Sequence, residues 1–151
     1  MEASAWLDRW KENRIGFHEG RTNAHLMAHF SRLKVPADGQ VFVPLCGKSV
    51  DMAYFAKHDA VQEIVGVDGV QKALEEFSKE QSDLKIEPSS SVDSRFEALR
   101  GPGISLLKGD FFLLDENATG GRFEAIFDRA SLVAIKPSLR ESYVKTIGRL
   151  L

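Results

Sequence analysis

The sequence predicts an α/β fold in which a mostly parallel β-sheet carries helices on both faces. Two observations predict it. The apolar run 41–45 leads into a turn at Gly47, and after a helix-like stretch a second β-branched run, 64–67, ends on Asp68. Strand, turn, helix and strand in this order form the βαβ unit typical of nucleotide-binding proteins.

The elements before this unit are predicted to be helical. Residues 3–11 form a short helix that places Trp6 and Trp10 on one face, because side chains four residues apart are neighbours on a helix. Asp8 then points elsewhere. A turn at 16–18 follows, and Asn23 caps a second helix that runs to about residue 33.

The elements after the Gly47 turn alternate between helix and strand. Ser49 can cap the next helix, and residues 70–81 have apolar side chains on one side only, as in a crossover helix. Residues 82–103 are polar and rich in Ser, Gly and Pro, so we interpret them as a long surface connection with some strand near Phe96.

Two further strands and a last helix are predicted beyond this connection. The strands span 104–107 and 123–127 and are followed by Asp110 and Arg129, respectively. The helix starts after Lys136, where a serine and a glutamate are spaced as a capping box.

Length and composition indicate one globular domain that acts on a small molecule. The chain has 151 residues, of which 43% are hydrophobic, and a formal net charge of −2. No basic field for nucleic acid or a membrane surface is evident. A single cysteine excludes an intramolecular disulfide, and no leader or membrane-spanning run is apparent, so a cytoplasmic protein is expected. It is also expected to be a monomer.

The glycine spacing separates three possible cofactors. A dinucleotide fingerprint needs G-x-G-x-x-G, whereas this turn has Gly47 and no neighbouring glycine, which disfavours NAD. The triplet at 47–49 imitates the end of a Walker A loop, but Phe42 stands where the opening glycine belongs, which disfavours ATP. An adenosyl cofactor without phosphates needs close approach to the backbone only for its amino-acid part, which the single glycine allows, and an acid for its ribose. Asp68, about 20 residues after the turn, can supply this acid.

The carboxyl ends of the predicted strands would gather Asp68, Asp110 and Arg129 at one edge of the sheet. Asp110 could accept a hydrogen bond from an adenine amino group, with Phe111 against the ring. Arg129 could instead pair with Asp128. Cys46 is interpreted as a small apolar residue under the loop, and no metal site is predicted because no third ligand accompanies the histidines of the second helix.

Three linked motifs resemble the thiopurine S-methyltransferase family, in its bacterial form. They are VPLCGKS at 43–49 with Asp51 and Met52, WLDRW at 6–10 with GFH at 16–18, and FDRASLVAI at 127–135. The resemblance runs from near the N-terminus to the last residue, in the family's order and approximate spacing.

The resemblance implies a Rossmann-like class I methyltransferase sandwich that uses S-adenosyl-L-methionine. Residues 1–151 would be a single domain, with 1–35 as an N-terminal helical lid and 40–151 as the α/β core. A complete member continues through about three more strands, so the sheet is expected to lack its C-terminal strands. The implied reaction is methyl transfer to the sulfur of a thiopurine or an aromatic thiol, and selenium or tellurium species are further acceptors.

The resemblance also implies roles for individual residues. Arg129 would stabilise the acceptor anion and Asp8 would position or deprotonate the acceptor through water. Phe17 and Arg129 would contact the acceptor. The residues expected at the cofactor are Trp6, Trp10, Phe17, Leu45, Gly47, Asp68, Asp110, Phe111 and Arg129. The alternatives are a related thiol or halide methyltransferase and a non-catalytic nucleotide-binding module.

Overall fold

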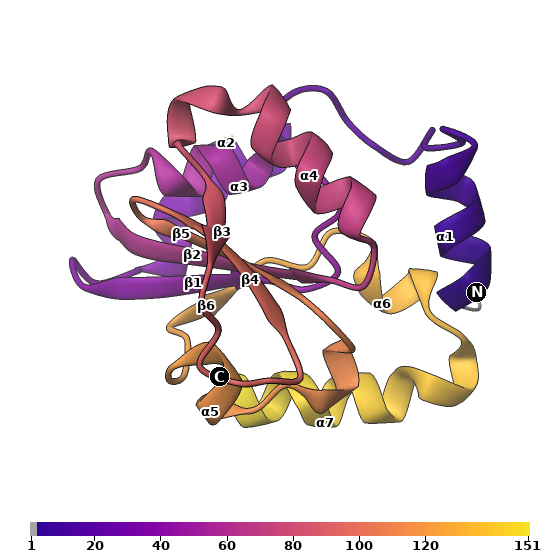
Figure 1. Ribbon diagram of the computed structural model, residues 1–151. Helices are drawn as coiled ribbons and strands as arrows, with labels where there is room; N and C mark the ends of the chain where they lie inside the picture. The colour runs from indigo at the N-terminus through magenta and orange to yellow at the C-terminus, as the bar shows by residue number, and fades with distance from the viewer. Residues whose placement is uncertain (1–2) are drawn as a thin grey trace.

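The protein has three layers, with one β-sheet between two layers of helices (Figure 1). The computed structural model describes residues 3–151. In this part of the chain the six strands lie in the order β3-β4-β5-β2-β1-β6. Their bounds are β1 Gly39–Val43, β2 Val61–Asp68, β3 Glu87–Ser89, β4 Glu97–Gly101, β5 Ile104–Lys108 and β6 Ala125–Ile126.

Helices cover both faces of the sheet, and α1 lies beyond one end of it (Figure 1). The α-helices are α1 Ala3–Lys11, α2 Ala24–His29, α3 Asp51–Ala56, α4 Gln71–Glu80, α5 Glu116–Thr119, α6 Ser131–Ala134 and α7 Arg140–Leu150. Short 3-10 helices are η1 Phe30–Leu33, η2 Ser82–Leu84, η3 Phe111–Leu113 and η4 Pro137–Leu139.

Strand β1 is central in the parallel part of the sheet. It pairs in parallel with β2 on one side and with β6 on the other, and β2 pairs in parallel with β5. Strand β4 is antiparallel to β5 and to β3. The predicted α/β class with a mostly parallel sheet is confirmed. Because the strand order reverses at β1, a crevice is expected at its carboxyl end.

The interpretation of 82–103 as a surface connection with some strand near Phe96 was right about the strand, which is β4, and wrong about the rest. The segment contains η2 and the strands β3 and β4, and Phe96 is buried just before β4. Strand β3 has no apolar face, since all three of its residues are exposed. It forms through backbone pairing with β4, which local sequence patterns do not reveal.

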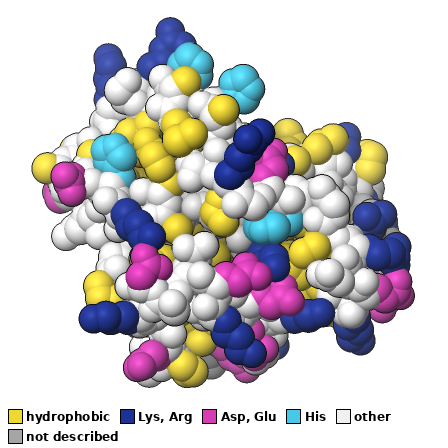
Figure 2. Space-filling view, turned by 90° about the horizontal axis from the view of Figure 1, so that it is seen from above, with side chains coloured by type: hydrophobic (Ala, Val, Ile, Leu, Met, Phe, Trp, Pro, Cys, Tyr) yellow, Lys and Arg dark blue, Asp and Glu magenta, His cyan; other side chains and the backbone are white. Residues whose placement is uncertain are grey.

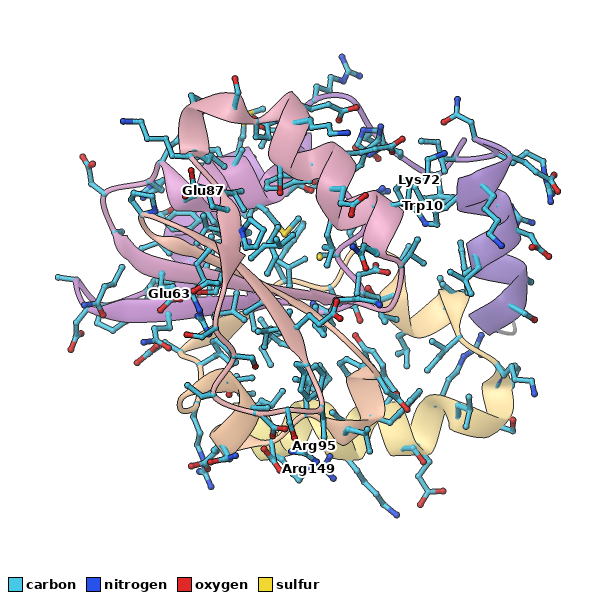
Figure 3. The ribbon with its side chains drawn as sticks, in the orientation of Figure 1. Trp10, Glu63, Lys72, Glu87, Arg95 and Arg149 are labelled. Atoms are coloured by element: carbon cyan, nitrogen blue, oxygen red, sulfur yellow. The ribbon has the colours of Figure 1, made fainter. Side chains whose placement is uncertain are left out.

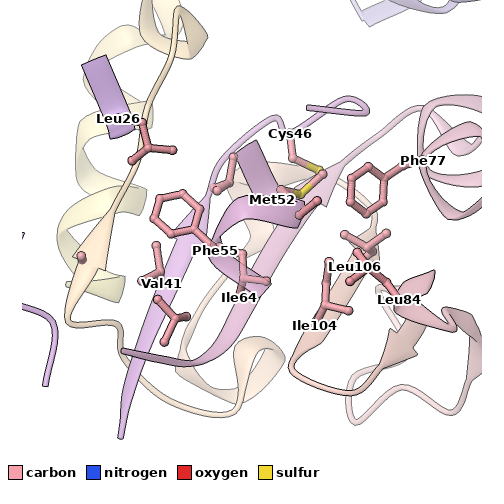
Figure 4. Packing of buried hydrophobic residues seen from close by; sticks show 14 of the residues in the cluster. Leu26, Val41, Cys46, Met52, Phe55, Ile64, Phe77, Leu84, Ile104 and Leu106 are labelled. Atoms are coloured by element: carbon pink, nitrogen blue, oxygen red, sulfur yellow. The ribbon is translucent and has the colours of Figure 1, made fainter. Parts of the chain in front are cut away.

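The core has two large clusters, one on each face of the sheet, and a small third one where Trp10 of α1 packs against Val70 and Ala73. Side chains of a strand point alternately to opposite faces, so Val41 and Val43 join one cluster while Phe42 joins the other. The first cluster packs beneath α2, α3 and α4, and Figure 4 shows part of it, including Met52 and Phe55. The second packs against η3, α5 and α7. This burial fixes the strand tips in place.

The helix starts match the predictions only in part. Asn23 caps α2 as predicted, because its Oδ1 accepts hydrogen bonds from the backbone N–H groups of His25 and Leu26 at 2.9 and 3.1 Å. The helix continues as η1 to Leu33. The predicted capping box near residue 138 does not form, since α7 begins after a 3-10 turn and has no side-chain cap. Helix α3 has Val50 and not Ser49 at its N-cap, but the Ser49 hydroxyl still accepts a hydrogen bond from the backbone N–H of Asp51, the first residue of the helix, at 3.2 Å.

Charges of both signs are mixed on the face seen in Figure 2, where Lys and Arg lie beside Asp and Glu. No large single-sign patch appears in that view, in keeping with the small net charge of −2. Among residues 3–151, the helices are all too short or too polar to cross a bilayer.

Candidate functional site

A pocket of about 700 Å³ lies at the carboxyl ends of the parallel strands. This volume is in the range of small-molecule sites. Its walls come from α1, the turn at 17–18, the loop at 43–49, residues 68–70 at the end of β2 and before α4, the turn at 109–112 and the segment 127–139. The crevice predicted from the strand order therefore exists, and α1 covers it.

The loop after β1 brings backbone close to the pocket. Leu45 and Gly47 both have positive φ, at +47° and +53°. A Cβ on Gly47 would meet the Trp10 ring at 3.3 Å, so a larger residue would push the indole away. The backbone N–H of Cys46 donates to the carbonyl of Val67 at 2.9 Å, which ties the loop to β2.

Asp68 joins this loop to the start of α4. Its Oδ2 accepts a hydrogen bond from the backbone N–H of Gly47 at 2.8 Å, and its Oδ1 accepts one from Val70 at 2.9 Å. Burial raises the pKa of the Asp68 carboxyl, although these backbone hydrogen bonds oppose the change. Each carboxylate oxygen has a second lone pair, so the group can still accept hydrogen bonds from a ligand's hydroxyls.

An aromatic cluster closes the pocket from the N-terminal side. The Phe17 ring lies edge-on to Trp6 and Trp10, with centroids 5.4 and 5.8 Å apart. Trp10 is buried and packs on Val70 and α4. Its carbonyl accepts a hydrogen bond from Lys72 Nζ at 2.8 Å, and the two residues face each other in Figure 3. These contacts hold α1 against the core.

The turn after β5 supplies an aromatic wall and a carboxylate. Phe111 is buried and stacks on Tyr143, with ring centroids 4.9 Å apart. Asp110 is exposed at the pocket, and its Oδ1 accepts a hydrogen bond from the backbone N–H of Phe112 at 2.9 Å. This bond caps η3 and holds the Phe111 ring at the pocket wall.

Arg129, just after β6, reaches back to the N-terminal segment. Its Nη2 donates to the carbonyl of Phe17 at 2.6 Å, and its Nη1 lies 3.2 Å from Glu19 Oε1. Asp128 instead accepts hydrogen bonds from the backbone N–H of Ser131, at 2.8 Å, and from the Tyr143 hydroxyl. The ion pair of Arg129 is therefore with Glu19 and not with its neighbour Asp128.

Comparison with known proteins assigns the chain to a family. The sequence profile of the thiopurine S-methyltransferase family matches residues 1–151. The chain belongs to this family. The thiopurine S-methyltransferase of Pseudomonas paraeruginosa is 39% identical over 151 residues, which are 100% of this chain and 66% of the relative. That of Pseudomonas aeruginosa is 40% identical over 143 residues, which are 95% of this chain and 63% of the relative.

The chain thus spans slightly less than two thirds of these thiopurine S-methyltransferases. Among solved structures, an S-adenosylmethionine-dependent methyltransferase from Thiobacillus denitrificans in complex with S-adenosyl-L-homocysteine is similar, with a TM-score of 0.61 and 14% identity over 95% of this chain and 50% of that one. This likeness shows the Rossmann-like fold of class I methyltransferases, as the sequence predicted.

The pocket brings together nearly all the residues expected at the site, from the strand ends and from the family motifs. Those in its wall are Trp6, Trp10, Phe17, Leu45, Gly47, Asp68, Asp110, Phe111 and Arg129. Asp8 is the exception. It is exposed and lies outside the pocket wall, because Trp6 and Trp10 occupy the face of α1 that turns inward.

Several polar residues in the pocket wall were not predicted, and they are His18, Lys48, Ser49, Ser131 and Lys136. His18 follows Phe17 in the family motif, and its pKa is lowered by burial and by the nearby charge of Lys48. Lys48 is buried and lies 2.8 Å from Glu80 and 3.3 Å from Glu76. Burial opposes its charge, but the hydrogen bond to Glu80 and the ion pair with Glu76 outweigh this and raise its pKa. Only the fold reveals these pairs, because α4 supplies both acids.

Cys46 has the structural role that the sequence predicted. The thiol is buried between β1 and α3. Burial raises the pKa of the Cys46 thiol well above its usual range, and the nearby Asp68 adds to the effect. A thiolate nucleophile is therefore disfavoured. Across residues 3–151, no group of three or more His, Cys, Asp and Glu side chains is placed to hold a metal ion.

Proposed function

We propose that this chain binds S-adenosyl-L-methionine in the pocket and serves methyl transfer to the sulfur of a thiopurine or an aromatic thiol. The observation that carries the proposal is Asp68. A buried carboxylate at the tip of β2, joined to the positive-φ loop at Gly47, is a suitable acceptor for ribose hydroxyls. The names of the relatives supply the acceptor class.

The pocket fits the adenosyl cofactor in three respects. Gly47 presents backbone at the pocket wall in a positive-φ turn, and the absence of a side chain there lets the Trp10 ring pack against the loop. Asp68 offers two carboxylate oxygens for sugar hydroxyls. Asp110 offers an acceptor for an adenine base, and Phe111, which is stacked on Tyr143, contributes an apolar wall beside it. Trp6 and Leu45 would complete the contacts.

Arg129 and Phe17 are the proposed acceptor-binding residues. The bound cofactor supplies an electrophilic methyl group. Arg129 is positioned to hold the acceptor as an anion, because its guanidinium lies in the pocket wall and two of its nitrogen atoms are fixed by Phe17 and Glu19. A thiolate needs no general base, so Asp8 has no part in the proposal. The chain's contribution is then positioning and the exclusion of water.

The remaining proposals concern organisation. We propose residues 1–151 as one cofactor-binding domain with 1–35 as its lid, acting as a cytoplasmic monomer on small molecules and not on nucleic acids or membranes. The mixed surface charge and the closed aromatic cover of the pocket support a small acceptor.

Calorimetric titration of the chain with S-adenosyl-L-homocysteine and with ATP tests the proposal. The homocysteine compound is expected to bind and ATP is not. ATP binding without binding of the homocysteine compound would contradict it. Methylation assays with 6-mercaptopurine, selenite and iodide then rank the acceptors, and cofactor binding without any methylation would favour the non-catalytic module.

A further inference from the structure

Glu19 is the one carboxylate that the structure pairs with Arg129 among the described residues. The two side chains are partly exposed, at 30% for Arg129 and 47% for Glu19. Arg129 lines the pocket, whereas Glu19 lies just outside its wall. The pair therefore lies at the rim of the pocket. A charged ligand inside the pocket can contact Arg129, and Glu19 contacts Arg129 from outside the pocket.

The arginine keeps its orientation without the charge of Glu19. Its Nη2 is held by the Phe17 carbonyl at 2.6 Å, a shorter contact than the 3.2 Å to Glu19. A guanidinium has five N–H donors, so donors remain for a ligand in the pocket. Glu19 thus contributes mainly negative charge, which reduces the attraction of Arg129 for an anion.

Lys48, another cation of the pocket wall, also has carboxylate partners. Lys48 pairs with Glu80 and Glu76, and burial together with Lys48 lowers the pKa of His18, which favours its neutral form. Lys136 also lines the pocket, so the Arg129–Glu19 pair sets one part of the positive charge that an anionic acceptor meets there, and it is the part that Glu19 adjusts.

We propose that Glu19 is a specificity-determining residue that weakens the binding of anionic acceptors relative to neutral ones of the same shape. The inference rests on the proposed function, because it assumes that the acceptor lies beside Arg129. Glu19 acts through Arg129 and does not itself touch the acceptor, so its effect is one of charge.

The test compares Glu19→Gln with the unchanged chain, both saturated with S-adenosyl-L-homocysteine. The probes are 4-nitrobenzenethiolate, which is anionic, and 4-nitrothioanisole, its neutral S-methylated counterpart. Glutamine keeps an acceptor for Arg129 but removes the charge. The thiolate is expected to bind about two- to fivefold more tightly to the variant, as for an exposed ion pair. The gain should shrink at high salt, and the neutral probe should bind equally to both.

Glu12→Gln is the matched control. Glu12 lies on the same N-terminal segment, is exposed and pairs with Arg14 at 2.6 Å, so its loss changes the net charge equally without touching Arg129. Its thiolate affinity should equal that of the unchanged chain.

Three outcomes would overturn the inference: an unchanged or weaker thiolate affinity in Glu19→Gln, an equal gain for both probes, or a gain of the same size in the control. Failure of the thiolate to bind either protein also counts against it. Failure of the proposed function looks different, because S-adenosyl-L-homocysteine itself would then not bind the unchanged chain.

Discussion

Replacing Asp68 with alanine is the most direct perturbation of the proposed cofactor site. The carboxylate accepts hydrogen bonds from the backbone N–H groups of Gly47 and Val70 at 2.8 and 2.9 Å and is only 8% exposed. The substitution therefore removes a ligand acceptor and also leaves two backbone donors without their partner.

Both losses can be given a size. Losing hydrogen bonds from the ribose hydroxyls to a charged acceptor should weaken cofactor binding by about 1–3 kcal/mol, which is roughly 5- to 150-fold in dissociation constant. The two donors belong to Gly47 and Val70, which both line the pocket, so water in the pocket can replace the carboxylate. We therefore expect the free energy of unfolding to fall by a total of about 1–3 kcal/mol.

Calorimetric titration with S-adenosyl-L-homocysteine measures the first effect and urea unfolding the second. Asp93→Ala is the matched control, because Asp93 is also 8% exposed and accepts a backbone hydrogen bond from Arg95 at 2.9 Å, but does not line the pocket. The control should lose stability and keep its cofactor affinity within about twofold, the ordinary effect of a change away from the site. A folded Asp68→Ala variant that binds as tightly as the unchanged chain would refute the assignment of Asp68 to the ribose.

Four further predictions concern other parts of the molecule. Arg129→Lys should weaken thiolate binding about tenfold through loss of the guanidinium fork while cofactor affinity, measured by calorimetry, stays the same. Gly66→Ala should lower the free energy of unfolding by about 1–3 kcal/mol, because a Cβ would meet the sulfur atoms of Met52 and Cys46 at 2.7 and 2.9 Å. Gly148→Ala is the control: a Cβ there would meet nothing within 4 Å, so this variant should not be destabilised in the same urea titration. Cys46 should react with a disulfide reagent far more slowly in the folded chain than in urea, since burial raises its pKa, and equal rates would contradict this. Hydrogen bonds from Arg95 lower the pKa of Asp93 from 3.8 to about 2. Between these two pH values the unfolded chain binds more protons than the folded chain, so the stability should fall as the pH drops through this interval. Asp93→Asn should remove this component from the pH dependence of the urea midpoint.

The sequence by itself determined the parallel core and most of the pocket wall. Strands β1 and β2 are apolar runs that end at a glycine turn and at Asp68, respectively. Both patterns are local, so they can be recognised in the sequence without knowledge of the fold. The rule that ligands bind at the carboxyl ends of parallel strands then placed Asp110 and Arg129 near Asp68. The family resemblance assigned the aromatic residues of α1 to the cofactor site, whereas periodicity alone would have assigned them to the hydrophobic core.

Only the tertiary structure decided how charges are paired and where irregular segments lie. Strand β3 forms because its backbone pairs with β4, although its side chains show no alternation of apolar and polar residues. Asp8 faces solvent, since the indole rings of α1 take the inward face. Lys48 meets its glutamates from α4, and Arg129 meets Glu19 across 110 residues of chain. Such contacts join residues that are distant in sequence, so their geometry depends on the packing of the whole sheet and cannot be inferred from local spacing.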